Sequence, residues 1–496
     1  MFDKVLIANR GEIAVRVIRA CHEEGLGAVA VYSDADRGAP HVLLAGEAVR
    51  IGAAAAAESY LSIDRLLAAA QETGAGAVHP GYGFLAENGG FARAVEAAGL
   101  VHVGPPAEAI EVMGDKTRAR ERMVAAGVPV IPGSDPLVSA QEAVREAGRI
   151  GFPVLLKAAA GGGGKGMHVV SDAEEMAGAF GRATREARAA FGDGRVFAER
   201  YLRAPRHIEI QVLADEERTV DLGERECSIQ RRHQKLIEEA PSTAIDDALR
   251  RRMAEVAVRA AEAVGYRGAG TVEFLVEGGE CFFLEMNTRI QVEHPVTELV
   301  TGVDLVRQQL RVARALPLLG GGEPPAPRGH AIECRINAED PAAGFVPSTG
   351  RIDRLEVPTG PGVRWDGGIR EGSEIGPHYD SLLGKLVVHA ADREAAILRM
   401  RPALEGLVID GVETTVPWHI AVMDEPDYRL NDLSIRYVEE HPGLGETADP
   451  ALRDVAMAAA VLLADRDRTR IVSGDARGPG DGGNGLSAWV RAGREW

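Results

Sequence analysis

The chain is poor in cysteine, in aromatic residues and in long apolar segments. Its four cysteines lie far apart and form no CxxC pair, which argues against a zinc site or a disulfide scaffold. The longest apolar run, residues 455–464, is too short to span a bilayer, and the N-terminus has no signal-peptide pattern. We therefore expect a cytoplasmic protein without a membrane partner, whose cysteines are small buried hydrophobic residues.

Positive charge is also scarce. Lysine and arginine number 56 against 74 acidic residues, so the formal net charge is −18. Binding a nucleic-acid backbone needs a basic surface, and we therefore expect no nucleic-acid partner. A nucleotide can still bind at a locally basic site. The 496 residues are long enough for about three domains with their own cores.

The order of apolar runs and turns predicts three domains and a tail. Strands alternate with helical segments over residues 1–113, which predicts an open parallel α/β domain. A second domain is expected over 114–327, in which 300–315 forms one helix. A third region, 328–445, mixes strands with a helix. The tail, 446–496, has no role that the sequence defines.

The stretch TVEFLVEGGECFFLEMN predicts a hairpin that carries two facing carboxylates. If its loop has three residues, Glu277 pairs with Cys281, and Glu273 lies opposite Glu285 with Asn287 on the same face. Two carboxylates about 5 Å apart repel each other, unless they hold a cation such as Mg²⁺, for which these oxygen atoms are suitable ligands. A two-residue turn would instead put the glutamates on opposite faces, and both registers stay open.

A glycine-rich loop, residues 160–167, lies between two predicted strands. It does not fit a P-loop, because Gly166 stands where a hydroxyl residue is needed. It also lacks the helix that a dinucleotide fingerprint requires. A flexible hairpin tip is the simplest alternative. Four consecutive glycines with Lys157 just upstream favour a flap that closes over phosphates.

Several other polar residues are candidate anion contacts. Lys116, Lys157 and His207 could contact phosphates, and the backbone of 199–202 could meet a nucleotide base. The basic run CSIQRRHQK is either a solvated loop or the holder of a small anion. Each feature alone has an ordinary structural explanation, and their combination with the hairpin points to a nucleotide site.

A further set of polar residues follows the hairpin. Arg289, Gln291 and Glu293 alternate, so an extended chain would place them on one face. There the first two could hold a carboxylate-like anion while Glu293 takes its proton. Arg335 either pairs with an acidic residue or stabilises negative charge that develops on a substrate.

Ten runs of the chain resemble biotin carboxylase, the ATP-grasp component of biotin-dependent carboxylases. They include HPGYGFLAEN, KAAAGGGGKGM, CSIQRRHQK, FLEMNTRIQVEHPVTE and RGHAIECRINAEDP, and they follow the family's order from residue 1 to about 445. The resemblance implies an α/β protein with three parts: an N-terminal open parallel α/β domain, an ATP-grasp domain with a mobile glycine-rich lid over about 130–203, and a C-terminal α+β domain.

The resemblance also implies roles for the matching residues. ATP would contact Lys116, Lys157, Gly163, Gly164, Glu199, Arg200, Tyr201, Leu202, His207, His233, Glu273 and Glu285. Mg²⁺ or Mn²⁺ would be held by Glu273, Glu285 and Asn287. Bicarbonate would lie against Lys235, Arg289, Gln291 and Val292. Lys235, Arg289, Glu293 and Arg335 would be catalytic, with Glu293 as the base and Arg335 as the biotin contact.

The implied function is an ATP-dependent ligase that carboxylates biotin through carboxyphosphate, in the first half-reaction of an acyl-CoA carboxylase. The chain lacks a lysine between two methionines, the signature of biotin attachment. The expected partners are therefore a separate biotin carboxyl carrier protein and a carboxyltransferase, and a homodimer is expected because Arg16 matches a dimer contact of the family. Two alternatives remain: another ATP-grasp ligase that forms an acyl phosphate, and a non-catalytic nucleotide-binding scaffold, which should have lost Glu293, Lys235 or a metal ligand.

Overall fold

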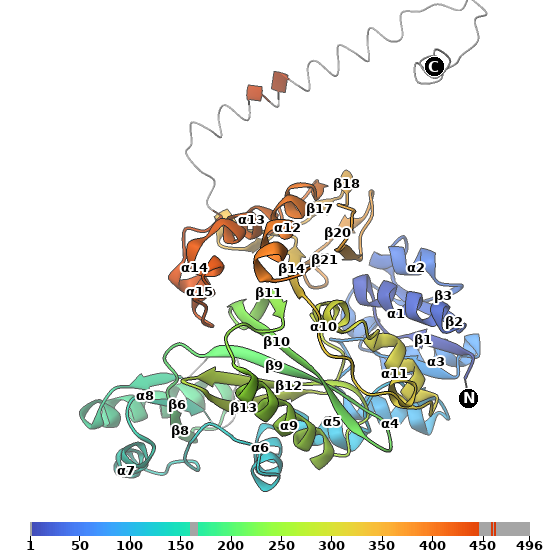
Figure 1. Cartoon of the computed structure of the whole chain (residues 1–496). Helices are drawn as coiled ribbons and strands as arrows, with labels where there is room; N and C mark the ends of the chain where they lie inside the picture. The colour runs from blue at the N-terminus through green and yellow to red at the C-terminus, as the bar shows by residue number, and fades with distance from the viewer. Residues whose placement is uncertain (1, 159–166, 446–457, 460, 463–496) are drawn as a thin grey trace, which may run out of the picture. The chain divides into compact units, whose positions relative to one another are not determined.

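The computed structural model describes residues 2–158 and 167–445, and four residues of the tail, 458, 459, 461 and 462. Met1–Gly445 is one compact unit and Glu446–Trp496 is another, and the first unit contains every predicted site residue (Figure 1). The predicted contacts of Gly163 and Gly164, and nearly all of the tail, lie outside the described residues. No described helix has both the length and the apolar composition that a bilayer-spanning segment needs.

The N-terminal part is an open parallel sheet of the order β3-β2-β1-β4-β5, as predicted. On β1, Val5 and Ile7 pack on one side with α1, and Leu6 packs on the other side with α3 and α4, so the strand is apolar at successive positions. The strands are β1 (Lys4–Ile7), β2 (Gly27–Ser33), β3 (Glu47–Gly52), β4 (Ala77–His79) and β5 (Val101–His102). The helices are α1 (Gly11–Glu23), α2 (Pro40–Leu44), α3 (Ile63–Thr73), α4 (Gly89–Ala97) and α5 (Ala107–Gly114), with 3₁₀ turns η1 (Asp34–Asp36) and η2 (Ala56–Glu58).

A small three-stranded antiparallel sheet comes next in the chain, of the order β7-β6-β8, and α7 and α8 share its core (Figure 1). It corresponds to the predicted lid. The elements of this part are α6 (Lys116–Ala125), α7 (Ala140–Ile150), β6 (Val154–Ala158), β7 (His168–Val170), α8 (Ala173–Phe191) and β8 (Val196–Arg200).

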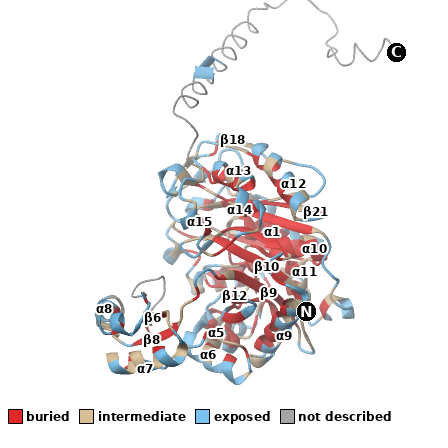
Figure 2. Cartoon of the chain, turned by 60° about the vertical axis from the view of Figure 1, so that its left-hand side comes forward, coloured by how far each residue is buried: buried red, intermediate tan, exposed pale blue. Residues whose placement is uncertain are grey.

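An eight-stranded antiparallel sheet forms the centre, of the order β13-β12-β9-β10-β11-β14-β21-β19. It passes without interruption across the boundary predicted between residues 327 and 328, and buried residues predominate in strands on both sides of that boundary, among them β9, β12 and β21 (Figure 2). Its strands are β9 (Arg206–Ala214), β10 (Thr219–Arg231), β11 (Gln234–Ala240), β12 (Gly268–Glu277), β13 (Glu280–Asn287), β14 (His330–Asn337), β19 (Val363–Gly367) and β21 (Leu382–Ala390).

Helices cover this sheet, and short elements complete the C-terminal part. The helices are α9 (Asp247–Ala263), α10 (His294–Thr301), α11 (Leu305–Ala313), α12 (Arg393–Glu405), α13 (Val416–Asp424), α14 (Pro426–Arg429) and α15 (Tyr437–Glu440), with 3₁₀ turns η3 (Leu318–Gly321) and η4 (Pro341–Ala343). The short strands are β15 (Glu339–Asp340), β16 (Val346–Pro347), β17 (Gly350–Arg351), β18 (Arg354–Glu356), β20 (Glu374–Ile375) and β22 (Val408–Asp410).

The single helix predicted over 300–315 is wrong. The chain forms α10 and α11 with a break between them, because Gly302 ends α10 at a φ of 73° and the Asp304 side chain accepts a hydrogen bond from the Arg307 N–H. A glycine with positive φ followed by a capping aspartate is a helix stop and a helix start in succession.

The β12–β13 hairpin has the facing glutamates that were predicted, but not the predicted loop. Its turn has two residues, since Glu277 pairs with Glu280. A register shift between Glu273 and Phe274 leaves Leu284 as an extra residue, and this bulge restores the pairing of Glu273 with Glu285. The register that brings the two carboxylates to one face is therefore set by a bulge and not by the length of the turn.

Candidate active site

The floor of the site is one face of the central sheet. Along β9, His207, Glu209 and Gln211 alternate with Ile208 and Ile210, which pack into the core that includes α9. The polar residues therefore all project from the opposite face, and they are buried. Glu209 was not among the predicted site residues, although the alternation in RHIEIQV already marks it.

Lys235, at the start of β11, lies among three buried carboxylates. Its ammonium group donates hydrogen bonds to Glu209 at 2.6 Å, to Glu273 at 2.9 Å and to Glu293 at 2.6 Å. Burial disfavours the charge on Lys235, but the three carboxylates hold its pKa well above the ordinary lysine value. The basic run CSIQRRHQK thus supplies the cation at the centre of the site, since it forms parts of β10 and β11 rather than a solvated loop.

Glu273 is the most highly connected of these carboxylates. Its Oε1 accepts hydrogen bonds from Asn287 at 2.8 Å and from Gln291 at 2.7 Å as well as from Lys235, and His207 Nε2 lies 3.0 Å from its Oε2. Burial alone would raise its pKa, yet Lys235 and His207 hold the pKa of Glu273 well below the usual range. Glu273 is therefore an ionised oxygen donor at neutral pH.

The residues predicted to hold a metal fit a hard divalent cation. Glu285, opposite Glu273, is partly solvent-exposed; the surrounding protein and the Glu273 carboxylate raise its pKa, and Lys116 at the start of α6 opposes this shift. A divalent cation would relieve this repulsion, and carboxylate and amide oxygens are the ligands that Mg²⁺ prefers. The amide oxygen of Asn287 accepts a hydrogen bond from Arg289 at 2.8 Å. His207 and Glu209 also place potential ligand atoms within 4.8 Å of one on Glu273.

Arg225 on β10 is fully buried and bonds to several residues of the site. Sequence reasoning missed it, because Arg225 stands between Glu224 and Glu226 in the sequence, and its partners on other strands are evident only once the sheet is assembled. Its guanidinium donates five hydrogen bonds, to Glu209 at 2.5 Å, Gln211 at 2.6 Å, Thr297 at 2.9 Å, Thr271 at 3.0 Å and Gln291 at 2.9 Å. Two of the acceptors, Glu209 and Gln291, also contact Lys235 or Glu273, so Arg225 fixes the positions of both.

The predicted base, Glu293, lies between two cations. Its Oε1 accepts from Lys235, and its Oε2 accepts from Arg335 Nη2 at 2.9 Å. Burial opposes its charge, but Lys235, Arg335 and Arg225 hold the pKa of Glu293 far below the ordinary value, so it is ionised at neutral pH. Arg335 also donates to Glu238 at 2.6 Å, a carboxylate that the sequence did not mark as functional.

Other residues of the site bond to Arg289, Gln291 and Glu293. The extended chain that the sequence predicts for this segment is wrong. Residues 288 and 289 form a bend and residues 292 and 293 a turn, so the chain does not run straight from Arg289 to Glu293. Gln291 donates a hydrogen bond to Glu273, and Arg289 donates one to Asn287 and lies 3.3 Å from Glu87. The carbonyl of Val292 accepts a hydrogen bond from Lys385 at 2.7 Å.

The predicted nucleotide contacts are divided between two sheets: Lys157 and residues 199–202 lie on or next to the small β7-β6-β8 sheet, whereas His207, Glu273 and Glu285 lie on the central sheet. Lys157 on β6 donates to Glu199 on β8 at 2.7 Å, and the hydroxyl group of Tyr201 accepts from Arg436 at 2.6 Å. The Arg200 side chain points to Glu280, away from the site, and Leu202 packs with Ile131 and Phe282 in a small apolar cluster. His233 lies in the exposed β10–β11 turn, where no contact to the other site residues is found among the described residues.

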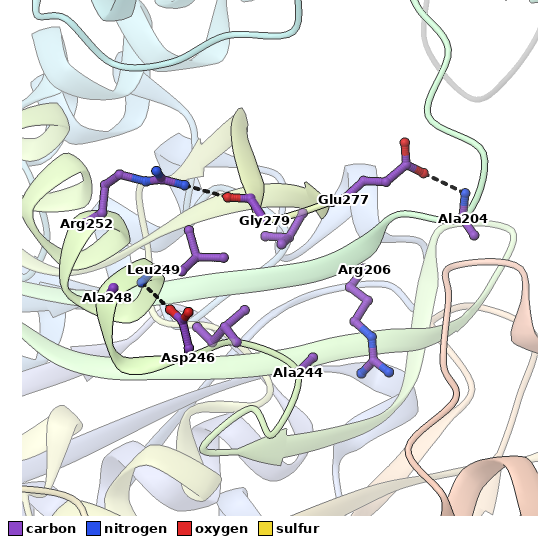
Figure 3. A pocket seen from close by; sticks show the side chains of 12 residues that line it. Ala204, Arg206, Ala244, Asp246, Ala248, Leu249, Arg252, Glu277 and Gly279 are labelled. Carbon is purple, nitrogen blue, oxygen red and sulfur yellow. Dashed lines mark hydrogen bonds between the residues drawn. The ribbon is translucent and has the colours of Figure 1, made fainter.

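A cavity of about 530 Å³ lies elsewhere, beside the tip of the β12–β13 hairpin (Figure 3). It is lined by Arg206, whereas the next residue, His207, faces the site, so the cavity lies on the opposite face of β9. Its polar groups bond to protein: Arg252 donates to the Gly279 carbonyl and Glu277 accepts from the Ala204 N–H. It therefore does not belong to the cluster around Lys235.

Comparison with known proteins identifies the family. Family models match the N-terminal domain of biotin carboxylase over residues 1–110, the ATP-binding domain of the carbamoyl-phosphate synthase L chain over 115–319, and the C-terminal domain of biotin carboxylase over 333–440. The biotin carboxylase of Haemophilus influenzae is 50% identical over 90% of this chain and 100% of its own length. The chain belongs to the biotin carboxylase family. It is an ATP-dependent ligase with an ATP-grasp domain.

Other members of the family act in different carboxylases. One of them, from the pyruvate carboxylase of Methanothermobacter thermautotrophicus, is 53% identical over 89% of this chain and 90% of its own length. The biotin carboxylase domain of the 2-oxoglutarate carboxylase of Hydrogenobacter thermophilus, solved as a dimer with MgADP, ADP and bicarbonate, superposes with a TM-score of 0.82, at 50% identity, over 90% of this chain and 100% of that one. Arg16, the residue expected at a dimer contact, is buried in this chain and pairs with Glu298 and Asp304.

Arg225→Met tests how much the hydrogen bonds of Arg225 contribute to the stability of the folded chain. The variant leaves Glu209 buried without its strongest partner, and we expect a loss of about 3–5 kcal/mol in the free energy of unfolding at neutral pH. Urea unfolding followed by circular dichroism measures it, with the exposed Arg203→Met as the matched control. A loss no larger than that of the control would show that the network contributes little.

Proposed function

We propose that this chain carboxylates biotin held on a separate carrier protein, with ATP and bicarbonate as co-substrates. The observation that carries the proposal is that Lys235 pairs with both Glu273 and Glu293, while Arg335 pairs with Glu293 from the other side. Membership of the biotin carboxylase family supports it, as do the nucleotide, magnesium and bicarbonate that the related 2-oxoglutarate carboxylase domain contains.

The proposed chemistry assigns a step to each group. Lys235, Arg289 and Gln291, with the backbone at Val292, bind bicarbonate, and Glu293 removes its proton, so that its oxygen attacks the γ-phosphorus of ATP and displaces ADP. The carboxyphosphate formed breaks down to CO₂ and phosphate, the phosphate removes the N1′ proton of biotin, and the biotin nitrogen adds to CO₂. Arg335 stabilises the negative charge that develops on the ureido oxygen of biotin. Closure of the glycine-rich lid would keep water from carboxyphosphate.

Phosphoryl transfer needs positive charge around the phosphates. Lys116 and Lys157 supply part of it, and His207 is a further proposed phosphate contact. Glu273, Glu285 and Asn287 would hold Mg²⁺ or Mn²⁺, which when bound offsets further phosphate charge. Gly163 and Gly164, the backbone of 199–202, and His233 complete the proposed ATP contacts.

The finer proposal concerns the partners. We propose that the carboxybiotin is used by a carboxyltransferase acting on acetyl- or propionyl-CoA, and that the chain works as a homodimer. Relatives that are 53% and 50% identical to this chain are named for pyruvate and 2-oxoglutarate carboxylases. The final acceptor therefore depends on the transferase partner. Identifying the carrier and transferase that co-purify with the chain tests this part; a keto-acid carboxyltransferase would contradict it.

Bicarbonate-dependent ATP hydrolysis, measured with and without free biotin or a purified carrier protein, tests the function itself. We expect the biotin compounds to stimulate hydrolysis, because biotin consumes the CO₂ that carboxyphosphate releases. Hydrolysis that neither compound changes would favour another ATP-grasp ligase, and the absence of any hydrolysis would favour a non-catalytic scaffold.

Glu285→Gln tests the metal ligands. The substitution keeps the shape of the side chain and removes its charge, so we expect the Mg²⁺ concentration needed for half-maximal ATP hydrolysis to rise about 10- to 100-fold. Glu280→Gln, on the same strand but paired with Arg200, is the matched control. An unchanged Mg²⁺ dependence would remove Glu285 from the ligand set.

Arg335→Ala tests the biotin contact. We expect biotin carboxylation to fall about 100-fold or more, as on removal of a donor to a developing oxyanion, while the affinity for ATP is nearly unchanged because Arg335 faces Glu293 and not the lid. Carboxybiotin formation and nucleotide binding by calorimetry are measured on the same preparation. An equal loss of both would indicate a structural role.

A further inference from the structure

Two buried glutamates face each other behind Arg335. Glu238 on β11 and Glu333 on β14 are directly paired residues of neighbouring antiparallel strands, and both are fully buried. Side chains in such a pair start from Cβ atoms about 5 Å apart. Arg335, two residues beyond Glu333, projects from the same face. The reaction proposed above assigns neither glutamate a role.

The two carboxyl groups differ in their partners. Glu238 Oε1 lies 2.6 Å from Arg335 Nε and 2.5 Å from its Nη2, and it accepts from the guanidinium. The other oxygen of Glu238 and both oxygens of Glu333 have no hydrogen-bond partner among the described residues. An ionised carboxylate buried without a partner is far more costly than a neutral carboxyl group. Glu333 is therefore the member of the pair that holds a proton.

The cations around the pair already have other anionic partners. Lys385 on β21 lies 3.1 Å from Glu12, and Arg335 pairs with both Glu238 and Glu293. Lys235, another titratable group near the pair, bonds to Glu209, Glu273 and Glu293. On α10, Glu298 pairs with Arg16 and Arg364, and His294 is the other titratable group. The remaining groups are the thiols of Cys227 and Cys334. Within the described residues, none of these cations forms a hydrogen bond with Glu333.

The expected titration agrees with this geometry. Burial raises the pKa of Glu333 well above the ordinary value; Lys385 and Arg335 oppose this shift, and the charges on Glu238 and Glu293 add to it. Burial also raises the pKa of Glu238, which Arg335 opposes. Two carboxylates this close cannot both ionise easily, so the pair retains one proton over the neutral range.

We propose that Glu238 and Glu333 form a one-proton carboxyl pair that positions Arg335 for the biotin step. Glu333 keeps the proton, and Glu238 stays ionised and holds the guanidinium beside Glu293. When the proton is lost to solvent at high pH, Glu333 becomes a second anion on the same face and competes for Arg335. The pair thus sets an alkaline limit on the biotin step, which is the part of the inference that rests on the proposed function.

Thermal unfolding of the full chain across pH tests the protonation of Glu333 without any assay of activity. Because the folded state raises the pKa of Glu333 above the unfolded value of about 4.3, the wild type loses stability through this group as the pH rises from that value towards the folded pKa. Glutamine has no such titration. The melting temperature of Glu333→Gln, relative to the wild type, is expected to increase with pH over this range.

Glu239→Gln is the matched control, one residue from Glu238. Glu239 is buried but binds Arg393 and His330, and despite its burial its pKa lies below the ordinary value, mainly because of Arg393. Its stabilisation is fully present above pH of about 4.3, so this variant should lose melting temperature relative to the wild type as the pH rises towards that value and show a constant difference above it. A Glu333→Gln difference that is independent of pH, or that has the sign of the control, overturns the proposal.

Infrared difference spectroscopy on the wild type keeps the test open if Glu333→Gln does not fold. We expect the carbonyl stretch of a protonated, buried carboxylic acid at neutral pH, which disappears at alkaline pH. In Glu238→Gln the neighbouring charge is gone and Arg335 is free to pair with Glu333, so the band should disappear at lower pH than in the wild type. A wild type without such a band at neutral pH overturns the proposal.

The role in positioning Arg335 is tested by pH profiles of kcat/KM for biotin and for ATP. The alkaline fall in the biotin profile is expected to move to higher pH in Glu333→Gln, while the ATP profile keeps its wild-type position. If the biotin profiles of the wild type and of Glu333→Gln superimpose, the positioning role is overturned. If the wild type shows no stimulation by biotin, the proposed function fails, whereas the thermal and infrared results still decide whether the pair shares a proton.

Discussion

The site depends on the compensation of buried negative charge by two cations, Lys235 and Arg225. Glu209, Glu273 and Glu293 would each be neutral or destabilising if buried alone. Lys235 bonds to all three, and Arg225 holds Glu209 from the other side. This arrangement keeps Glu273 and Glu293 ionised at neutral pH, which the proposed metal binding and the proposed proton removal from bicarbonate require. Stability and function thus rest on the same ion pairs.

The continuous central sheet makes that compensation possible. The carboxylates come from β9, β12 and the N-terminal end of α10, whereas Lys235 comes from β11 and Arg335 from β14. Strand pairing holds these segments at a fixed spacing. Because the backbone is already ordered in the sheet, bringing the long side chains together costs little additional conformational entropy. The bulge at Leu284 serves the same end, because it turns Glu285 to the face of Glu273.

Arg335 links this centre to a second layer of charge. It bonds to Glu293 in the site and to Glu238 behind it, and Glu238 faces Glu333. A guanidinium held from two sides keeps its orientation as a substrate arrives, which is the preorganisation that stabilisation of developing charge requires. The layer behind the site therefore contributes to its electrostatics as well as to packing.

Local sequence was enough to predict many of the elements and the family. Periodicity located the parallel N-terminal sheet, whereas the alternation in TVEFLVE and FFLEMN left two registers open for Glu273 and Glu285, because the pattern does not reveal the bulge at Leu284. The motif runs identified the family. Local patterns do not specify which strands become neighbours, so Arg225, Glu238 and Glu333 were not recognised, and the curved chain that brings Arg289 and Gln291 to the hairpin was taken as extended. Only the folded chain reveals those contacts, because a buried charge is recognisable as functional only when its partners, distant in sequence, are in place.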